Sequence, residues 1–264
     1  MCCENGIPYG SGPEIKDVSS AVAKADYAPT DVGKDASQRG KEVILFFKNK
    51  GLPVEIGFAF AGVWGAESGI KTWNFNKEEQ TKGGYWAGKY SETKKFEIEG
   101  VTYHYSQEVM QKFGYGKGVA QWSWDRPLKF RIWYNTKATE AEKTPGMPTM
   151  DKYASGITAT CATSQIGFAW YECSQRTGEL KRTFDSIQTA EPGSEKFRQN
   201  MIVAVDAVLR GFENGSTKSM ASVQKMNEGY AKAGGYDRAM ENRVSWALGL
   251  YEKLKDDPDI FGQT

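Results

Sequence analysis

One carboxylate closes a run of small and apolar residues in the first third of the chain. In the stretch GVWGAESGI, residues 62–70, Glu67 ends that run and is followed by Ser68 and Gly69. Gly69 is a poor residue for continuing a helix, and a buried carboxylate is costly unless it is paired. Glu67 therefore either turns into water at a helix end or is held where its proton takes part in chemistry. A sheltered glutamate can serve as a general acid, because apolar burial raises the pKa of a carboxyl group toward neutral pH.

A second motif, GVAQWS at residues 118–123, lies near the middle of the chain. Gln121 offers an amide that can bind an N-acetyl group or a backbone, and we expect it to line the site. Trp122 offers an indole that packs either against a sugar face or into the core. For Trp122 we expect packing in the core at least as much as contact with a sugar.

Glu-Ser at the end of a small-residue helix, then a β-wing, then Gly-apolar-small-Gln-Trp resembles the order of elements in the lysozyme-like superfamily. The phage tail lysozyme family, related to goose-type lysozymes and lytic transglycosylases, is the more similar member. The first region of resemblance is FFKNKGLPVEIGFAFAGVWGAESGI, residues 46–70, and the second is Gly118 to Trp122 with Arg126.

The resemblance continues toward the C-terminus and covers about residues 37–254. QIGFAWYE, residues 165–172, is similar to the family's glutamine-to-glutamate helix, and GFEN, residues 211–214, to its helix-ending Phe-Glu turn. The chain departs from the family in a long insertion at about residues 73–113. It also has IKTWNFN, residues 70–76, where the family tends to have a short turn.

The resemblance implies a muramidase that hydrolyses β-1,4 glycosidic bonds of peptidoglycan. Glu67 would be the general acid that protonates the leaving oxygen while positive charge develops on the sugar. The substrate-binding residues would be Ser68, Gln121, Trp122, Gln165 and Glu172, with no metal ion and no cofactor. Peptidoglycan and other phage tail proteins would be the partners, and the protein would be found in the virion tail, or in the host cytoplasm before lysis.

Three alternatives stay open beside the muramidase. A lytic transglycosylase would use the same Glu67 but form an anhydro-sugar. An inactive lysozyme-like domain would serve as a tail plug or a wall-binding module. A free endolysin would act from inside the cell at lysis.

The other polar residues of the resembling helices have structural interpretations as well. Gln165 and Glu172 lie seven positions apart on a predicted helix and either reach a cleft or form a buried structural pair. Glu213 is expected to be a helix-end cap or an ion-pair partner.

A second carboxylate is not assigned. Glu97 and Glu99 alternate on a predicted strand and are expected to be solvated, and Asp125 follows the Gln-Trp motif. His104, the single histidine, is expected to be a hydrogen-bonding residue at a strand end rather than a base.

The elements that must position these residues are mostly helices. Helical periodicity, caps and glycine stops predict helices at about 36–51, 52–67, 106–114, 127–136, 163–176, 194–214 and 235–254. Alternation around Glu99 and Gly100 predicts a small β-hairpin over 94–105. The small residues of 52–67 let neighbouring elements approach closely, so we expect that helix in the middle of the fold.

The expected fold class is mainly α, a lysozyme-like α+β fold with a small β-hairpin and a C-terminal helical lobe. Residues 1–36 are expected to be a flexible arm and 37–136 the catalytic lobe with the hairpin. A polar linker with two prolines follows at 137–153, and 154–264 is the helical lobe packed on the catalytic lobe.

Composition narrows the function classes. The 264 residues carry 34 basic and 33 acidic side chains, which gives no electrostatic reason to expect nucleic acid or a membrane as a partner. No stretch reaches the roughly 18 apolar residues of a membrane span, and the start lacks the apolar region of a secretory signal. A single histidine argues against a multi-histidine zinc site and against a Cys-His peptidase.

Aromatic and cysteine residues are the remaining compositional signals. The chain has 8 Trp, 13 Tyr and 13 Phe, which pack in the core or, for some rings, line a carbohydrate groove. Cys2 and Cys3 fall in the predicted arm, and Cys161 and Cys173 are expected to be free, buried thiols.

Overall fold

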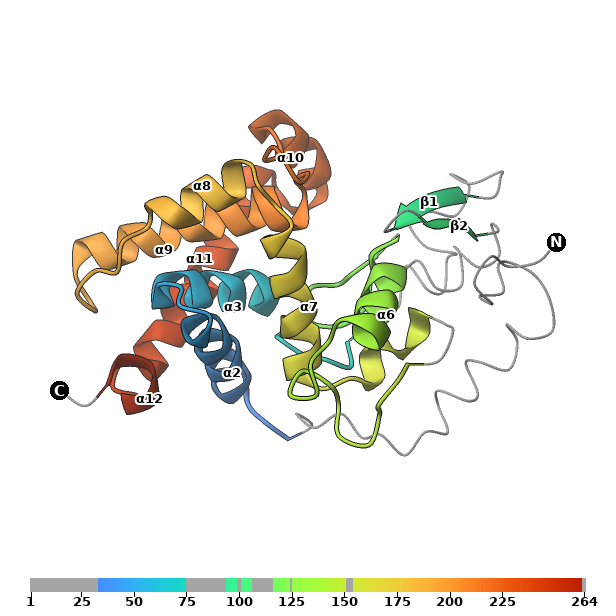
Figure 1. Cartoon of the computed structure of the whole chain (residues 1–264). Coiled ribbons are helices and arrows are strands. Elements are labelled where there is room, and N and C mark those ends of the chain that lie inside the picture. The colour runs from blue at the N-terminus through green and yellow to red at the C-terminus, as the bar shows by residue number, and fades with distance from the viewer. Residues whose placement is uncertain are drawn as a thin grey trace. The chain divides into compact units, whose positions relative to one another are not determined.

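The computed structural model describes residues 33–74, 94–98, 101–105, 116–123, 125–150 and 154–262, and Figure 1 traces the chain. The described part is mainly helical, which confirms the expected class at that level. Two compact units are present. Residues 33–70 and 169–264 form the first, here called the helical unit. The second, here called the middle unit, is described within residues 71–168.

This division differs from the expected lobes at 37–136 and 154–264. The chain leaves the helical unit after Ile70 and returns to it within a helix, after Phe168. Residues 137–150, expected to be a linker, are tied to the preceding helix. Tyr134 Oη donates to Met147 O at 2.6 Å and accepts from Thr144 N at 2.9 Å.

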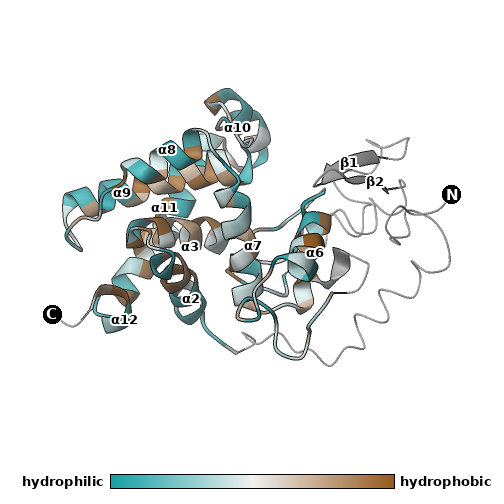
Figure 2. Cartoon of the chain, viewed as in Figure 1, coloured by the Kyte–Doolittle hydropathy of each residue, from teal (hydrophilic) through white to brown (hydrophobic). Residues whose placement is uncertain are grey.

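The helical unit contains helices from both ends of the sequence. They are α2 (Ala36–Asn49), α3 (Val54–Ser68), α8 (Glu179–Ser186), α9 (Glu195–Ala207), η3 (Val208–Glu213), α10 (Val223–Gly229), η4 (Ala231–Ala233), α11 (Tyr236–Leu254) and α12 (Pro258–Phe261). The helices predicted at 36–51, 52–67, 194–214 and 235–254 are confirmed, with the last turns of 194–214 being π-helical. The shorter α8, α10 and α12 were not predicted. Figure 2 shows the bands of teal and brown that amphipathic α9 presents.

Helix α3 lies in the middle of its unit, packed against α2, α9 and α11. Every residue from Val54 to Gly65 is buried. Gly57 and Gly62 permit the close approach. A Cβ on Gly57 would lie 2.9 Å from Ile44 Cα, and one on Gly62 would lie 2.7 Å from Ala247 Cβ. The expectation that the small-residue helix is central is therefore confirmed for the helical unit.

Aromatic rings fill the core around α3. Phe47 of α2 stacks on Phe60 with ring centroids 4.3 Å apart, and Trp64 contacts Phe60 and Phe212 at 5.2 and 6.2 Å. These rings are fully buried or nearly so, and burial of such large apolar surfaces supplies most of the stabilisation of a helical unit.

The middle unit carries two strands and the Gln-Trp motif. Its elements are β1 (Lys94–Ile98), β2 (Val101–Tyr105), α6 (Arg126–Thr136), η2 (Ala154–Ala159) and the first half of α7 (Ala162–Ser174). The strands pair antiparallel, with Lys94 opposite Tyr105 and Ile98 opposite Val101. Trp122, Phe130 and Phe168 form its aromatic core, with centroids 5.0 to 5.8 Å apart.

Several expectations fall outside the described residues: the arm up to residue 32, the helix at 106–114, and Cys2 and Cys3. Cys161 and Cys173 are buried, as expected. Among the described helices, none combines the length and apolar composition that a membrane crossing needs.

Candidate active site around Glu67

Glu67 is held at a fixed helix end. Gly69 adopts a left-handed conformation with φ of 66° and terminates α3, and its N–H donates to Gly65 O at 2.9 Å. The guanidinium of Arg39 donates to Gly69 O through Nε at 3.2 Å and Nη2 at 3.0 Å. The break after Glu67 is therefore a capped turn whose position two separate contacts define.

A buried cation pairs with the Glu67 carboxylate. Nη2 of Arg243, from α11, donates to Glu67 Oε1. Arg243 is itself held by a hydrogen bond from Nη1 to Ala239 O at 2.9 Å and by the ring of Tyr230, 4.8 Å from its guanidinium carbon. The guanidinium gives Glu67 a charged neighbour, whereas the sequence analysis expected apolar burial of this carboxylate.

The two oxygens of Glu67 have different surroundings. Its side chain is 26% exposed, while that of Arg243 is 6% exposed. Oε1 is the atom bonded to Arg243, and Oε2 accepts no hydrogen bond from the residues that the structure describes. A protonated carboxyl keeps one acceptor oxygen and gains one donor, so Oε2 can carry and release a proton while Oε1 stays bonded to Arg243.

Tyr230 completes the support of this ion pair. Its hydroxyl lies 3.3 Å from Arg243 Nη2. Burial, and next the negative charge of Glu67, raise the pKa of Tyr230 to about 12. The phenol is therefore neutral across the physiological range and acts as a dipole beside the pair, not as a charge.

A second carboxylate approaches the same end of α3. Glu213 is the last residue of π-helical η3, and its Oε1 accepts a hydrogen bond from Trp64 Nε1 at 3.1 Å. Trp64 lies one turn before Glu67 on α3. The charge of Glu213 also contributes to the raised pKa of Tyr230, so both carboxylates act on the same phenol. π-helical turns are rare and occur often at functional sites.

Gln165 has a structural role in the middle unit. Its side chain is fully buried; Oε1 accepts from Val119 N at 2.9 Å, and Nε2 donates to Ile157 O at 2.9 Å and to Thr72 O at 3.1 Å. These contacts fix the turn that carries the Gln-Trp motif. The prediction that Gln165 contacts substrate does not fit this burial, whereas the alternative of a buried structural residue does.

The two motif residues differ in burial. Trp122 is fully buried against Phe130 and Phe168, which agrees with the core interpretation. Gln121 is half-buried with φ of 48°, an unusual conformation for a residue other than glycine, and its Nε2 donates to Gly118 O at 2.9 Å. Gln121 and Glu67 belong to different units, so a cleft shared by the two stays a prediction.

Other predicted site residues are placed as follows. Ser68 is 6% exposed and its hydroxyl donates to Trp64 O at 3.0 Å, which does not fit contact with substrate. Glu172 is half-buried on the part of α7 that belongs to the helical unit. Asp125 forms an ion pair with Lys129 at 2.6 Å at the start of α6. Glu99 lies outside the described residues, as do the side chains of Glu97 and His104.

Sequence analysis missed Arg243 and Tyr230. The signal for Arg243 is its position four residues before Ala247 on the buried face of α11, because a cation on a buried helical face requires a partner. No comparable signal identifies Tyr230.

In the part of the chain that the structure describes, no group of three His, Cys, Asp or Glu side chains could hold a metal ion. Comparisons of the chain with protein-family models, with curated proteins and with solved structures found no match.

Proposed function

We propose that the chain is a peptidoglycan-degrading muramidase that hydrolyses β-1,4 glycosidic bonds with Glu67 as the general acid. The observation that carries the proposal is the capped, Arg243-bonded carboxylate at the end of a buried helix, in a sequence context that resembles lysozymes. A general acid needs a fixed position relative to the leaving oxygen, and Gly69 and Arg39 supply that rigidity.

The ion pair assigns different roles to the two oxygens of Glu67. Oε1 stays bonded to Arg243, and Oε2 is the oxygen that carries the acid's proton. Oε2 gives this proton to the glycosidic oxygen, and the bond between that oxygen and the anomeric carbon breaks. The carboxylate stabilises the positive charge on the sugar until a water adds to the anomeric carbon, and the proton that the water loses restores the acid.

The wider proposal follows the resemblance. The fold is lysozyme-like, with β1 and β2 as the wing, and Gln121 is the remaining substrate-binding candidate of its motif. The protein acts on the wall from a phage tail, with other tail proteins as partners, and resides in the virion.

One observation favours a second candidate. A glutamate neutralised by a buried arginine is also what an inactive, wall-binding lysozyme-like module would keep for stability. A lytic transglycosylase would use Glu67 equally well.

Product analysis tests these candidates. The purified chain is incubated with peptidoglycans of several wall types, and the released fragments are weighed by mass spectrometry. Muropeptides with reducing ends are expected. Anhydro-ended fragments would replace the hydrolase by a transglycosylase, and binding to the wall without any release would contradict enzymatic activity.

A further inference from the structure

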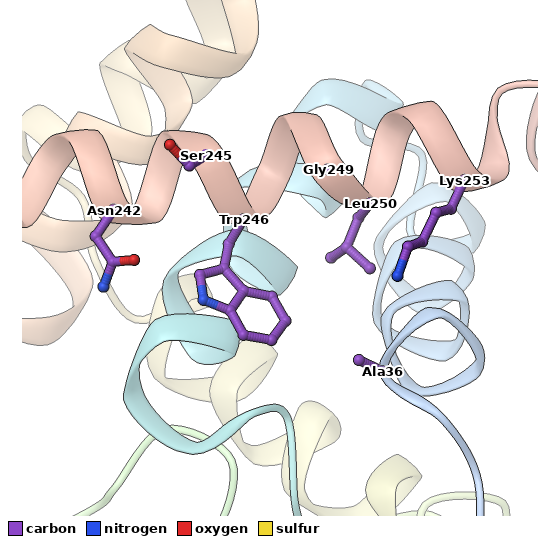
Figure 3. A pocket seen from close by; sticks show the side chains of 7 residues that line it. All are labelled: Ala36, Asn242, Ser245, Trp246, Gly249, Leu250 and Lys253. Atoms are coloured by element: carbon purple, nitrogen blue, oxygen red, sulfur yellow. The ribbon is translucent and has the colours of Figure 1, made fainter.

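A groove of about 320 Å³ runs along α11 in the helical unit, beside the first residue of α2. Figure 3 shows Asn242, Trp246 and Lys253 projecting from the same side of α11. Gly249 forms part of the lining, and a Cβ placed on it would meet no atom within 4 Å. The groove is therefore open directly above this glycine.

The groove is continued by a hollow that Arg243 lines. A neighbouring hollow of about 550 Å³ is lined by Arg243, the partner of Glu67, and shares Asn242 and Ser245 with the groove. Trp246 lies against Gly65, since a Cβ on that glycine would be 2.5 Å from the indole. Gly65 is two residues before Glu67, so the indole of Trp246 packs against the end of α3 that carries Glu67.

The lining has the chemistry of a saccharide site. The indole of Trp246 is half-buried and fixed from below, and an aromatic face packs well against the apolar face of a sugar ring. Asn242 offers an amide for hydroxyl or N-acetyl groups, and Lys253, about three helical turns further along, offers a cation for carboxylates. A groove with one flat ring, polar side chains and one cation suits a glycan that carries carboxylates better than an apolar peptide helix.

We propose that this groove binds the glycan strand of peptidoglycan, with one sugar ring on Trp246 and the strand continuing past Asn242 toward Glu67. The proposal rests on the muramidase function proposed above and names part of its substrate path. Lys253 meets the carboxylates that the wall's peptide stems and muramic acids carry.

Gly249→Leu is the variant that tests the groove. The leucine side chain would occupy the space above Gly249, and leucine favours a helix interior over glycine, so the fold is retained. Gly229→Leu is the matched control, because a Cβ at Gly229 also meets no atom within 4 Å and lies at the end of α10. Binding of de-peptidated glycan oligomers is measured by calorimetry in full chains that also carry Glu67→Gln, which prevents turnover.

Gly249→Leu is expected to weaken glycan binding at least tenfold at an unchanged or raised melting temperature. Trp246→Ala is expected to weaken it similarly, and Gly229→Leu to leave it unchanged. Unchanged affinity for glycan in a folded Gly249→Leu chain would overturn the proposal. The proposal would also be overturned if Gly249→Leu weakened binding of free stem peptides and left binding of glycan unchanged. In chains with Glu67 intact, muropeptide release that Gly249→Leu does not alter would reject the groove and keep the muramidase.

Discussion

The Glu67–Arg243 pair is asymmetric in exposure, and this asymmetry governs what each residue contributes. Arg243 is almost fully buried, whereas Glu67 reaches solvent. Removing the charge of Glu67 leaves a buried cation without its counter-ion, which costs more than removing Arg243 from a partly exposed carboxylate. Arg243 therefore fixes Glu67 in place, and Glu67 is the member of the pair that a substrate can reach.

Tyr230 supplies a residue-scale prediction with a defined sign. Its pKa is raised from 10.0 to about 12 in the folded protein, so the folded state holds this proton more tightly than the unfolded chain. The resulting stability is fully present below pH 10 and is lost as pH rises from about 10 to about 12. The free energy of unfolding of the wild type should therefore fall over that range relative to Tyr230→Phe, by about 2 kcal/mol.

Glu67→Gln should act on the same titration. Without the negative charge of Glu67 the phenolate is less disfavoured, so the pKa of Tyr230 should fall, as followed by NMR of labelled tyrosines assigned with Tyr230→Phe. An unchanged Tyr230 titration in the variant would show that the two residues do not interact in solution.

At the scale of elements, the contact between α3 and α11 depends on glycines. A Cβ on Gly62 would lie 2.7 Å from both Ala247 Cβ and Arg243 O. Gly62→Ala should therefore destabilise the protein by about 1–3 kcal/mol, because the backbone of α11 must move away. It should also displace Arg243, and because the charge of Arg243 lowers the pKa of Tyr230, that pKa should then rise further.

Gly249→Ala, on α11, is the control for Gly62→Ala. Its Cβ meets open space, so helix propensity alone should stabilise the protein by up to about 1 kcal/mol. Chemical denaturation measures both variants. Equal effects of the two alanines would contradict the close packing of α3 on α11.

Local pattern was enough to predict the long helices but not what pairs with them. The spacing of apolar residues and the glycine stops predicted α2, α3 and α11, because these helices are determined mainly by signals within their own sequence. The π-helical turn that presents Glu213 reads as ordinary helix in the sequence. The Glu67–Arg243 pair joins residues 176 positions apart, and no short-range pattern encodes which charges meet.

Burial distinguishes residues that the resemblance named together as substrate-binding candidates. Core packing was left open for Trp122 and a buried structural role for Gln165, and both residues are fully buried, whereas Gln121 is half-buried. The residue type does not reveal whether a side chain supports the turn or contacts a ligand, because that depends on packing.

At the scale of the whole molecule, Glu67 depends on the C-terminal third of the chain. Helix α3 packs on α9 and α11, and Arg243 comes from α11. A fragment of residues 37–136, the expected catalytic lobe, should therefore fail to fold α3, because its buried faces would be exposed to water. Hydrogen exchange and circular dichroism measure this against the full chain. If the fragment unfolded cooperatively and its α3 amides were protected from exchange, α3 would not need residues 169–264. That result would contradict a helical unit built from both segments of the chain.

The most direct test of the account is the release of muropeptides by folded Glu67→Gln. The amide keeps an acceptor for Arg243 but cannot donate a proton as an acid does, and the unmatched cation should cost about 1–3 kcal/mol of stability. Glu252→Gln, which removes an exposed carboxylate of α11 paired with Lys255 at 3.0 Å, is the matched control.

Both variants are assayed below their melting temperatures with the same peptidoglycan. Release by Glu67→Gln is expected to fall at least about 100-fold, while Glu252→Gln keeps the wild-type rate. Wild-type release by a folded Glu67→Gln protein would contradict the central claim.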